Sequence, residues 1–238
     1  MLNSLLENLS SLVFPAECEI CGRALNVGPA SGVCPSCASK IRWIPAPHCS
    51  GCGRTRLGQS PRCSACHEET YGFDRAFACA AYEGVMRDLL HVYKFKYRKH
   101  LKIFFTDLAR QFILAHLSDD RFDAVLPVPS GVDRRLERGF NPPELISREI
   151  AATLNIPHPA SHFVRTRSES AQALLAKTGR KQNVKGVFFV KQTGFFNSKR
   201  LLLIDDILTT GQTASECSKI LKEAGASSVT VLALARGI

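Results

Sequence analysis

The sequence predicts an α/β protein in which a parallel β-sheet is flanked by helices and preceded by a small cysteine-rich module. Short apolar runs alternate with helical patterns along most of the chain, and such alternation implies parallel strands joined by right-handed crossovers. The aliphatic run 201–204 has the unbroken character of a strand buried on both faces. Eight of the ten cysteines lie between Cys18 and Cys66. We therefore expect two domains, residues 1–70 and 71–238.

The cysteines of this module form four pairs with C-x-x-C spacing: Cys18/Cys21, Cys34/Cys37, Cys49/Cys52 and Cys63/Cys66. Each pair can supply two corners of a tetrahedral zinc site, so we expect two structural Zn²⁺ ions, each held by four thiolates. The spacing leaves open whether neighbouring pairs combine or interleave. Disulfides and an iron–sulfur cluster are the alternatives. No secretory signal precedes the cysteines, and a reducing cytoplasm favours metal-bound thiolates over disulfides.

Residues around the pairs support this interpretation. Gly22 and Gly53 each follow the second cysteine of a pair, where the backbone bends sharply around a metal. His48 and His67 flank ligands, but a complete set of cysteines predicts that both are surface residues. The remaining cysteines, Cys79 and Cys217, are expected to be small buried apolar residues.

The first predicted helix precedes the module. Apolar residues from Leu2 to Val13 recur at helical spacing, and Pro15 ends the pattern. Membrane docking is one interpretation, but no Lys or Arg precedes Arg23 to face anionic lipid, which favours packing onto the body of the protein. No segment reaches the ~18 consecutive apolar residues needed to span a bilayer. We expect a cytoplasmic protein without a transmembrane segment.

The remaining elements follow from the apolar periodicity. In chain order they are a strand at 77–82, helices at 85–92 and 101–117, a strand at 124–128, a helix at 145–154, strands at 187–190 and 201–204, a helix opening at 213–216, and a strand at 229–234. Residues 159–186 are rich in Arg, Lys, Ser and Gln and predict a mobile flap or hairpin. Segments of that composition can close over a phosphorylated substrate.

A ligand site is predicted where the strand 201–204 ends, because ligands of open α/β sheets bind at the carboxyl ends of the strands. Asp205 and Asp206 can accept hydrogen bonds from the hydroxyls of a ribose. The turn that follows supplies hydroxyls, a glycine and a helix N-terminus, which suit a phosphate. Its residues are Thr209, Thr210, Gly211, Gln212 and Thr213.

The spacing of Thr213 and Glu216 predicts a capping box that opens the next helix. Taken singly, the acids are typical of solvated loop charges and the threonines of turn formers. As one ordered string in a strand, loop and helix context, they favour a sugar-phosphate site. The loop lacks the Gly-Lys-Ser/Thr ending of a Walker motif and the glycine spacing of a dinucleotide fingerprint.

Three segments carry a family resemblance. The string from Leu202 to Thr213 resembles the 5-phosphoribosyl 1-diphosphate (PRPP) motif of type I phosphoribosyltransferases. The segment 123–141, with Pro127-Val128-Pro129-Ser130, Arg134, Arg135 and Arg138-Gly139-Phe140-Asn141, resembles the pyrophosphate-side loop of the ComF family, the competence-associated branch. The segment 165–188, with Arg165, Arg167, Gln172, Leu174, Arg180, Asn183 and Phe188, resembles the one this family carries where transferases keep a mobile loop. The cysteine pairs resemble its double zinc ribbon, so the chain is identified as a ComF member.

The resemblance implies a type I phosphoribosyltransferase-like sheet that binds PRPP with Mg²⁺ and displaces pyrophosphate at the anomeric carbon. Asp205 and Asp206 would be the catalytic residues, holding the ribose and favouring its cationic transition state. The turn 209–213 would hold the 5-phosphate. Ser130, Gly131 and Arg134 would face the pyrophosphate, with Arg167 or Arg180 as lid contacts. The implied activity is that of a pentosyl glycosyltransferase with an unknown acceptor.

The charge distribution supports a second hypothesis. The net charge is +10, and almost all of the excess lies after residue 70. The segment 91–102 interleaves Tyr93, Phe95 and Tyr97 with lysines, an arginine and histidines, which is typical of single-stranded nucleic-acid binding and equally of an amphipathic helix end with buried rings. The alternative function is therefore a non-catalytic competence factor that binds single-stranded DNA, is regulated by PRPP and contacts the DNA-uptake machinery.

Overall fold

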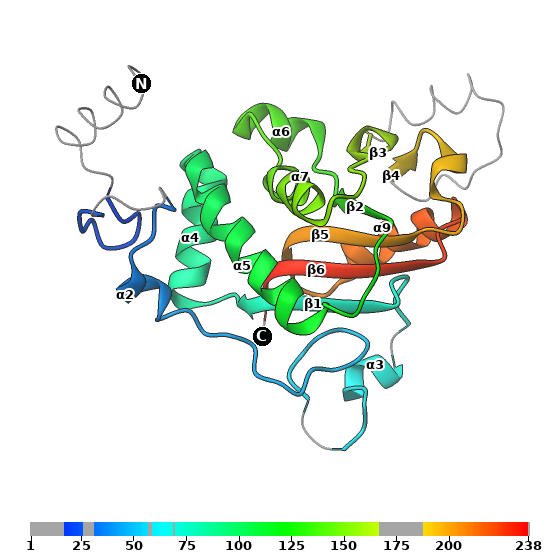
Figure 1. The fold of residues 1–238 in the computed structure, drawn as a ribbon, viewed down its shortest axis with the longest axis horizontal. Helices are drawn as coiled ribbons and strands as arrows, with labels where there is room; N and C mark the ends of the chain where they lie inside the picture. Colours follow the sequence, from blue (N-terminus) through cyan, green and yellow to red (C-terminus); the bar gives the residue numbers. More distant parts are fainter. Residues whose placement is uncertain (1–16, 26–30, 57–58, 69, 167–187, 238) are drawn as a thin grey trace.

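A four-stranded parallel sheet forms the body of the protein, with strand order β1-β6-β5-β2 (Figure 1). The structure is a computed structural model, and it describes residues 17–25, 31–56, 59–68, 70–166 and 188–237. The strands are β1 (Arg75–Ala81), β2 (Ala124–Pro127), β5 (Arg200–Leu208) and β6 (Ser228–Arg236). The predicted helix at Leu2–Val13 and most of the predicted flap lie outside the described residues.

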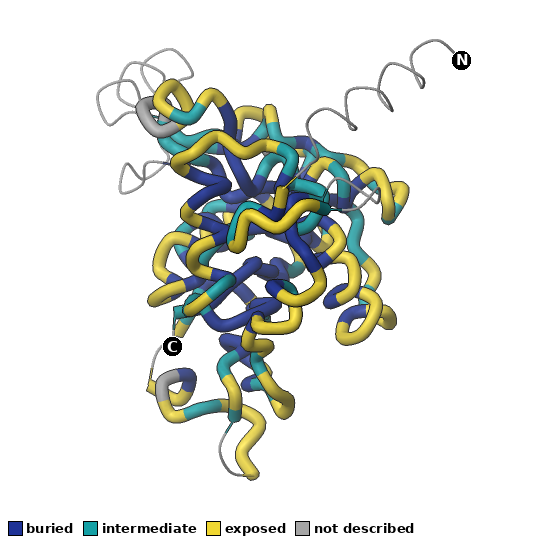
Figure 2. Tube along the Cα trace, turned by 90° about the vertical axis from the view of Figure 1, so that its left-hand side faces the viewer, coloured by how far each residue is buried: buried dark blue, intermediate teal, exposed yellow. Residues whose placement is uncertain are grey.

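Helices cover both faces of this sheet. On one face pack α4 (Gly84–Phe95), α5 (Lys102–His116) and α7 (Pro142–Leu154), and on the other packs α9 (Gln212–Glu223). Alternate residues of β5 belong to the two cores: Leu202 and Ile204 face the first, Leu201 and Leu203 the second. Burial on both faces explains the unbroken aliphatic run. Figure 2 shows the buried residues gathered through the middle of the molecule.

Shorter elements connect these layers. They are α2 (Pro35–Ala38), α3 (Ser64–Glu68), η1 (Lys99–Leu101), α6 (Val132–Arg138), η2 (Ala160–His162), β3 (Phe163–Arg165), β4 (Phe188–Val190) and η3 (Thr193–Phe196). The helix α6 has no counterpart in the sequence prediction, because its sequence is almost wholly polar and shows no apolar face. The helix α7 begins earlier than predicted, since Pro142 occupies its first turn, where proline is favoured.

The strand predicted at 187–190 forms, but its expected place in the parallel sheet is wrong. β4 instead pairs antiparallel with β3, with Phe163 opposite Val190 and Arg165 opposite Phe188. A parallel neighbour needs a crossover of a dozen or more residues, and only the short η3 connects β4 to β5. β3 and β4 flank residues 167–187 as the two strands of a hairpin would.

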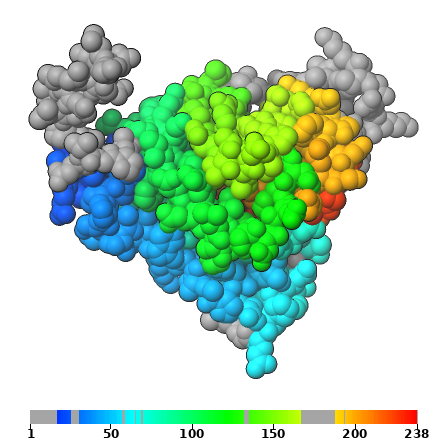
Figure 3. Space-filling view, viewed as in Figure 1, coloured from blue at the N-terminus to red at the C-terminus, as the bar shows by residue number. Residues whose placement is uncertain are grey.

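The cysteine-rich module runs along the outer edge of β1 (Figures 1 and 3). The N–H of Ala81 donates to the carbonyl of Arg42 at 2.9 Å, and the N–H of Ala76 donates to the carbonyl of Gly51 at 2.8 Å. Trp43 also forms an antiparallel bridge with Ala80. Backbone groups of an edge strand that face away from the sheet are thereby satisfied. The division into two domains at residue 70 stays a prediction.

None of the described helices combines the length and apolarity needed to cross a lipid bilayer.

Candidate functional site

The two predicted acids lie within β5, not beyond its end as the sequence suggested. β5 continues to Leu208 because β6 pairs with it throughout, with Asp205 opposite Ala233 and Leu208 opposite Arg236. On the other side, β2 pairs with β5 only as far as Ile204, opposite Pro127. The acids therefore stand where β5 has lost its β2 neighbour. This is still the carboxyl edge of the sheet, where ligands of α/β proteins bind.

Asp205 is buried at this edge. Its Oδ1 accepts a hydrogen bond from the backbone N–H of Asp206 at 2.8 Å. Burial, together with the nearby charge of Asp206, raises the pKa of Asp205 to about 7, although Lys94 acts in the opposite direction. Asp205 therefore changes charge in the neutral range, which makes its charge sensitive to any cation that binds beside it.

Asp206 forms an ion pair that sequence reasoning missed. Its Oδ2 lies 2.8 Å from the Nζ of Lys94 on α4, and the two side chains are only 17% and 11% exposed, respectively. The sequence placed Lys94 in the basic segment, where an exposed position was one interpretation. The available signal was helical spacing from the buried positions Met86 and Leu90, but the identity of the partner depends on the fold.

Tyr93 brings a second polar group to the same place. Its side chain is fully buried against Phe105 and Phe140, and its hydroxyl has no hydrogen-bond partner among the described residues. Burial and the charge of Asp206 raise its pKa, so Tyr93 stays protonated. The end of α4 thus places a cation against Asp206 and, near it, a neutral hydroxyl without a partner among the described residues.

The threonine turn opens α9 as predicted, but the capping box is wrong. The N-cap residue is Gly211, which has φ +83° and no side chain to cap the helix, and the hydroxyl of Thr210 accepts a hydrogen bond from the backbone N–H of Gln212 at 3.3 Å. Thr213 therefore lies in the first turn, two positions too far along the chain to cap it. Thr209, Thr210, Gln212 and Thr213 are exposed, while Gly211 is buried. An uncapped helix N-terminus beside exposed hydroxyls suits an oxyanion.

A cavity of about 360 Å³ lies at the carboxyl end of β2. Ser130 lines it, and the buried hydroxyl of Ser130 has no partner among the described residues. Arg135, Arg165 and Lys191 also line the cavity, and Arg135 is paired with Glu144. Its wall is therefore rich in cations.

The structure brings the predicted acids, the threonine turn, Ser130 and Gly131 to one edge of the sheet. Gly131 is the N-cap of α6 and lies next to Arg165. Neither the φ of −62° at Gly131 nor the space around it requires a glycine. Arg134 lies in α6, and its side chain is outside what the structure describes. Arg167 and Arg180 also lie outside the described residues.

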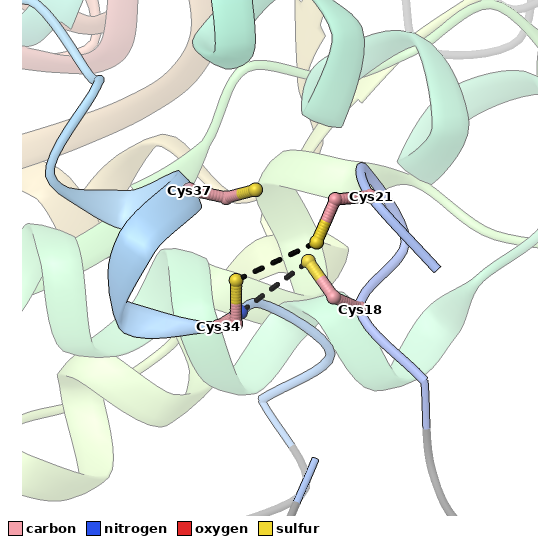
Figure 4. Close-up of side chains that lie close together, drawn as sticks. All are labelled: Cys18, Cys21, Cys34 and Cys37. Atoms are coloured by element: carbon pink, nitrogen blue, oxygen red, sulfur yellow. Dashed lines mark hydrogen bonds between the residues drawn. The ribbon is translucent and has the colours of Figure 1, made fainter. Parts of the chain in front are cut away.

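The eight module cysteines form two groups in sequential order. Cys18, Cys21, Cys34 and Cys37 make one group, and Cys49, Cys52, Cys63 and Cys66 make the other. Within each group the sulfurs lie within 4.8 Å of one another. Figure 4 shows the first group, in which Cys18 and Cys21 come from one loop and Cys34 and Cys37 from the start of α2. This arrangement fits two tetrahedral Zn²⁺ sites, and the interleaved alternative does not occur.

In each group, the sulfur of one cysteine accepts a backbone hydrogen bond. The N–H of Cys34 donates to the Sγ of Cys18 at 3.4 Å, and the N–H of Cys63 donates to the Sγ of Cys49 at 3.2 Å. Burial opposes ionisation, but the backbone N–H groups outweigh it and lower the pKa of Cys18 and of Cys49 to about 6. A thiolate is the form that binds metal.

The other cysteines and the histidines take no part in these groups. Cys79 and Cys217 are buried, as predicted, and burial raises the pKa of each. His67 is exposed, as predicted. His48 is half-buried rather than a surface residue, because its ring packs near Phe77 and its Nε2 lies 3.1 Å from the carbonyl oxygen of Ile44.

The aromatic and basic segment divides between its two interpretations. Tyr93 and Lys94 are buried, as an amphipathic helix end requires. Phe95 and Tyr97 are 54% and 53% exposed, as a nucleic-acid surface requires. The guanidinium of Arg138 lies 4.8 Å from the ring centroid of Phe95, and the hydroxyl of Tyr97 donates to the carbonyl of Glu137 at 2.6 Å. The exposed half of the segment is thus held against the end of α6.

Comparison with known proteins agrees with this architecture. A model described as "Double zinc ribbon domain" matches residues 9–67. The chain is 28% identical to Competence protein F of Haemophilus influenzae over 232 residues, covering 94% of this chain and 98% of that protein. It is 27% identical to DNA utilization protein YhgH of Escherichia coli K12, with 94% and 99% covered, and 28% identical to Competence protein ComFC of Streptococcus pneumoniae, with 92% and 100% covered.

Two solved structures overlap part of the chain. One is titled as the structure of the allosteric regulatory enzyme of purine biosynthesis, with 23% identity, a TM-score of 0.35, and coverage of 51% of this chain and 23% of that one. The other is phosphoribosylpyrophosphate synthetase from Mycobacterium smegmatis, with 19% identity, a TM-score of 0.32, and coverage of 56% and 33%.

The parallel sheet, its flanking helices and the two four-cysteine sites define an α/β protein with an N-terminal double zinc ribbon. Relatives that match along nearly the whole chain confirm the resemblance given by the sequence motifs. Along nearly its whole length, the chain is similar to the proteins named Competence protein F and Competence protein ComFC.

Proposed function

We propose that this protein binds PRPP with Mg²⁺ at the carboxyl edge of β5 and β2 and transfers or exchanges the ribosyl group at an acceptor, as a pentosyl glycosyltransferase. One observation carries the proposal: Asp205 and Asp206 stand at an open strand edge, followed at once by an exposed threonine turn and an uncapped helix N-terminus. Carboxylates suit the ribose hydroxyls, and the turn suits the 5-phosphate.

The acids are the proposed catalytic residues. Lys94 pairs with Asp206 and fixes the position of its carboxylate, which accepts hydrogen bonds from the ribose and stabilises the positive charge that develops on the sugar ring. Asp205 loses its proton readily when a cation approaches, because its pKa already lies near 7. Bound Mg²⁺ would offset the charge of the diphosphate.

The pyrophosphate side of the site is assigned to the loop after β2. Ser130 has a buried hydroxyl without a partner, and Gly131 follows it. Arg165 and Lys191 add positive charge to the same cavity, and Arg134 belongs to the same loop and helix. Cations and hydroxyl donors that are already in place stabilise a leaving diphosphate without reorganisation.

We further propose a role in DNA uptake, because relatives that match along nearly the whole chain are named competence and DNA utilization proteins. The alternative function, a non-catalytic factor that binds single-stranded DNA and is regulated by PRPP, is favoured by the exposed rings of Phe95 and Tyr97 among cations. Rings stack on bases and cations follow phosphates. Contacts with the uptake machinery belong to the same proposal.

Isothermal titration of the zinc-replete protein with PRPP and Mg²⁺ tests the common element. We expect saturable heat in the wild type, loss of it in Asp206→Asn, and no change in the control Asp119→Asn, whose side chain is exposed in the loop after α5. No heat with folded protein at millimolar PRPP would contradict both functions.

Two further measurements separate the functions. Pyrophosphate release from PRPP, screened against nucleobases and nucleotides, supports the transferase if it is lost in Asp206→Asn. Binding to single-stranded oligonucleotides that falls steeply with salt and weakens in Lys96→Ala/Tyr97→Ala, without turnover of any acceptor, supports the alternative.

A further inference from the structure

Arg236, the last residue of β6, connects the sheet to the second four-cysteine site. Its side chain points out of the sheet toward the module, and its Nη1 donates to the carbonyl of the zinc ligand Cys52 at 2.7 Å. The residue is only 3% exposed. Its Nε has no hydrogen-bond partner, and no carboxylate forms an ion pair with it, within the part of the chain that the structure describes. A buried guanidinium is therefore left without an acidic partner there.

Such an arrangement is costly unless a negative charge lies close by, because a buried cation loses its hydration. Burial lowers the pKa of Arg236 and the charge of Arg54 adds to this effect, whereas Cys52, Tyr71 and Cys66 oppose it. Two of these belong to the second four-cysteine site. Four thiolates around one divalent zinc leave that site with a net negative charge. With zinc bound, this site would supply the counter-charge that Arg236 lacks.

Among the described residues, the first four-cysteine site has no equivalent buried cation. The charged residues that are buried in the described chain are Lys94, Asp205 and Arg236, and the first two belong to the ligand edge of β5. The two ribbons therefore differ in their surroundings, although their ligand geometry is alike. This difference lets one ribbon act as the internal control for the other.

The second site also lies next to the threonine turn. The N–H of Gly237, the residue after Arg236, donates to the carbonyl of Leu208 at 3.1 Å, just before Thr209. The chain leaving Cys66 places the stacked rings of Tyr71 and Phe73 against Gly211. Gly72 lies between these two residues in the sequence, and its N–H donates to the hydroxyl of Ser215 at 2.8 Å. Both ends of the turn are thus held by residues adjoining the second zinc site.

We propose that Arg236 is the charge partner that retains zinc in the second ribbon, and that metal occupancy of this ribbon, but not of the first, holds the threonine turn in place. Arg236 is a positioning residue, since it acts through Cys52 and through its neighbour Gly237. The second half of the proposal rests on the proposed function, because it assigns the turn to a sugar phosphate.

Zinc release from the full-length, zinc-loaded protein tests the first half. A chromogenic chelator follows the release, and pulses of N-ethylmaleimide followed by peptide mass spectrometry report which cysteines become free. In Arg236→Gln we expect Cys49, Cys52, Cys63 and Cys66 to be labelled about 10–100-fold faster than in the wild type, the usual effect of losing a residue that supports metal ligands. The first group should be labelled at the wild-type rate.

Two variants control this experiment. Arg236→Lys keeps the charge and should stay near the wild type, while Arg200→Met removes an exposed arginine at the opposite edge of the sheet, paired with Asp123, and should change neither group. Equal labelling of both groups in Arg236→Gln, or wild-type rates throughout, would overturn the role of Arg236. Should Arg236→Gln fail to fold, the unequal chelator sensitivity of the two groups in wild type and Arg236→Lys remains the deciding measurement.

Labelling in the presence of PRPP and Mg²⁺ tests the second half. Protection of the second group alone supports coupling to the turn. Equal rates with and without PRPP, in a sample whose titration shows that PRPP binds, refute the coupling. Absence of PRPP binding refutes the proposed function and with it the coupling, whereas the labelling of Arg236→Gln still decides the role of Arg236.

Discussion

A pair of matched substitutions, Gly22→Ala and Gly53→Ala, probes how the zinc ribbons are joined to the sheet. The two glycines follow the second cysteine of equivalent pairs and have nearly the same backbone conformation, with φ of +68° and +72°. Their surroundings differ. A Cβ at residue 22 would meet nothing within 4 Å, whereas a Cβ at residue 53 would lie 2.3 Å from the carbonyl oxygen of Ala76 and 2.8 Å from the Cα of Phe77.

The expected costs follow from this difference. Either alanine must adopt a left-handed conformation, which costs about 1–2 kcal/mol. For Gly22→Ala that is the whole effect. Gly53→Ala must also push the ribbon away from β1, which adds about 1–3 kcal/mol for overpacking. Displacement of the ribbon weakens the hydrogen bond from Ala76 to Gly51, worth about 1 kcal/mol. We therefore expect a total of about 3–6 kcal/mol for Gly53→Ala.

Urea unfolding of the zinc-replete protein, followed by circular dichroism, measures both free energies of unfolding. Zinc content is determined in parallel, so that loss of metal is not mistaken for loss of docking. Similar costs for the two variants, or a larger cost for Gly22→Ala, would refute the inference that the second ribbon packs directly on the backbone of β1.

Three other predictions concern the site and the metal. Lys94→Met leaves the mostly buried carboxylate of Asp206 without its cation, so we expect the free energy of unfolding to fall by about 3–5 kcal/mol. The double variant Lys94→Met/Asp206→Leu should largely restore it. A loss below about 1 kcal/mol in the single variant would show that the pair contributes little. The raised pKa of Asp205 means that its stabilising contribution is complete below pH ~4 and is lost as pH rises through about 7. The Tm of Asp205→Asn relative to that of the wild type should therefore rise between pH 5 and pH 8. A constant Tm difference would argue against this titration. Zinc removal by a strong chelator should lower the Tm and expose eight reactive thiols, both reversed by added Zn²⁺; an unchanged Tm would show that the ribbons do not stabilise the body.

The parts of the structure that the sequence predicted best depend on local patterns. The cysteine pairs could be assigned to metal binding from the sequence, because two cysteines with C-x-x-C spacing can occupy two corners of a tetrahedral site through local geometry alone. The run Leu201–Ile204 was recognised as a strand because an aliphatic run of that length needs burial on both faces. The threonine turn was placed correctly because a strand, a loop and a helix occur in the order that a ligand site requires.

The parts that were missed depend on distant neighbours. The length of β5 is set by β6, which pairs with it beyond Ile204, and no property of Asp205 or Asp206 alone signals a strand. The ion pair between Lys94 and Asp206 joins the end of α4 to β5 and exists only once the sheet has formed. The capping box failed because Gly211, with its left-handed backbone, starts the helix two residues before Thr213.

The cysteine-rich module covers the outer edge of β1, and this has a consequence for the protein when zinc is absent. The backbone of Arg42, Trp43 and Gly51 occupies positions that another β-strand would otherwise take, and those loops keep their shape through the nearby thiolate clusters. Without zinc, the outer edge of β1 is expected to be exposed, and exposed strand edges of two molecules can pair with each other. We expect zinc starvation to be seen first as self-association into insoluble material, ahead of any change within the sheet.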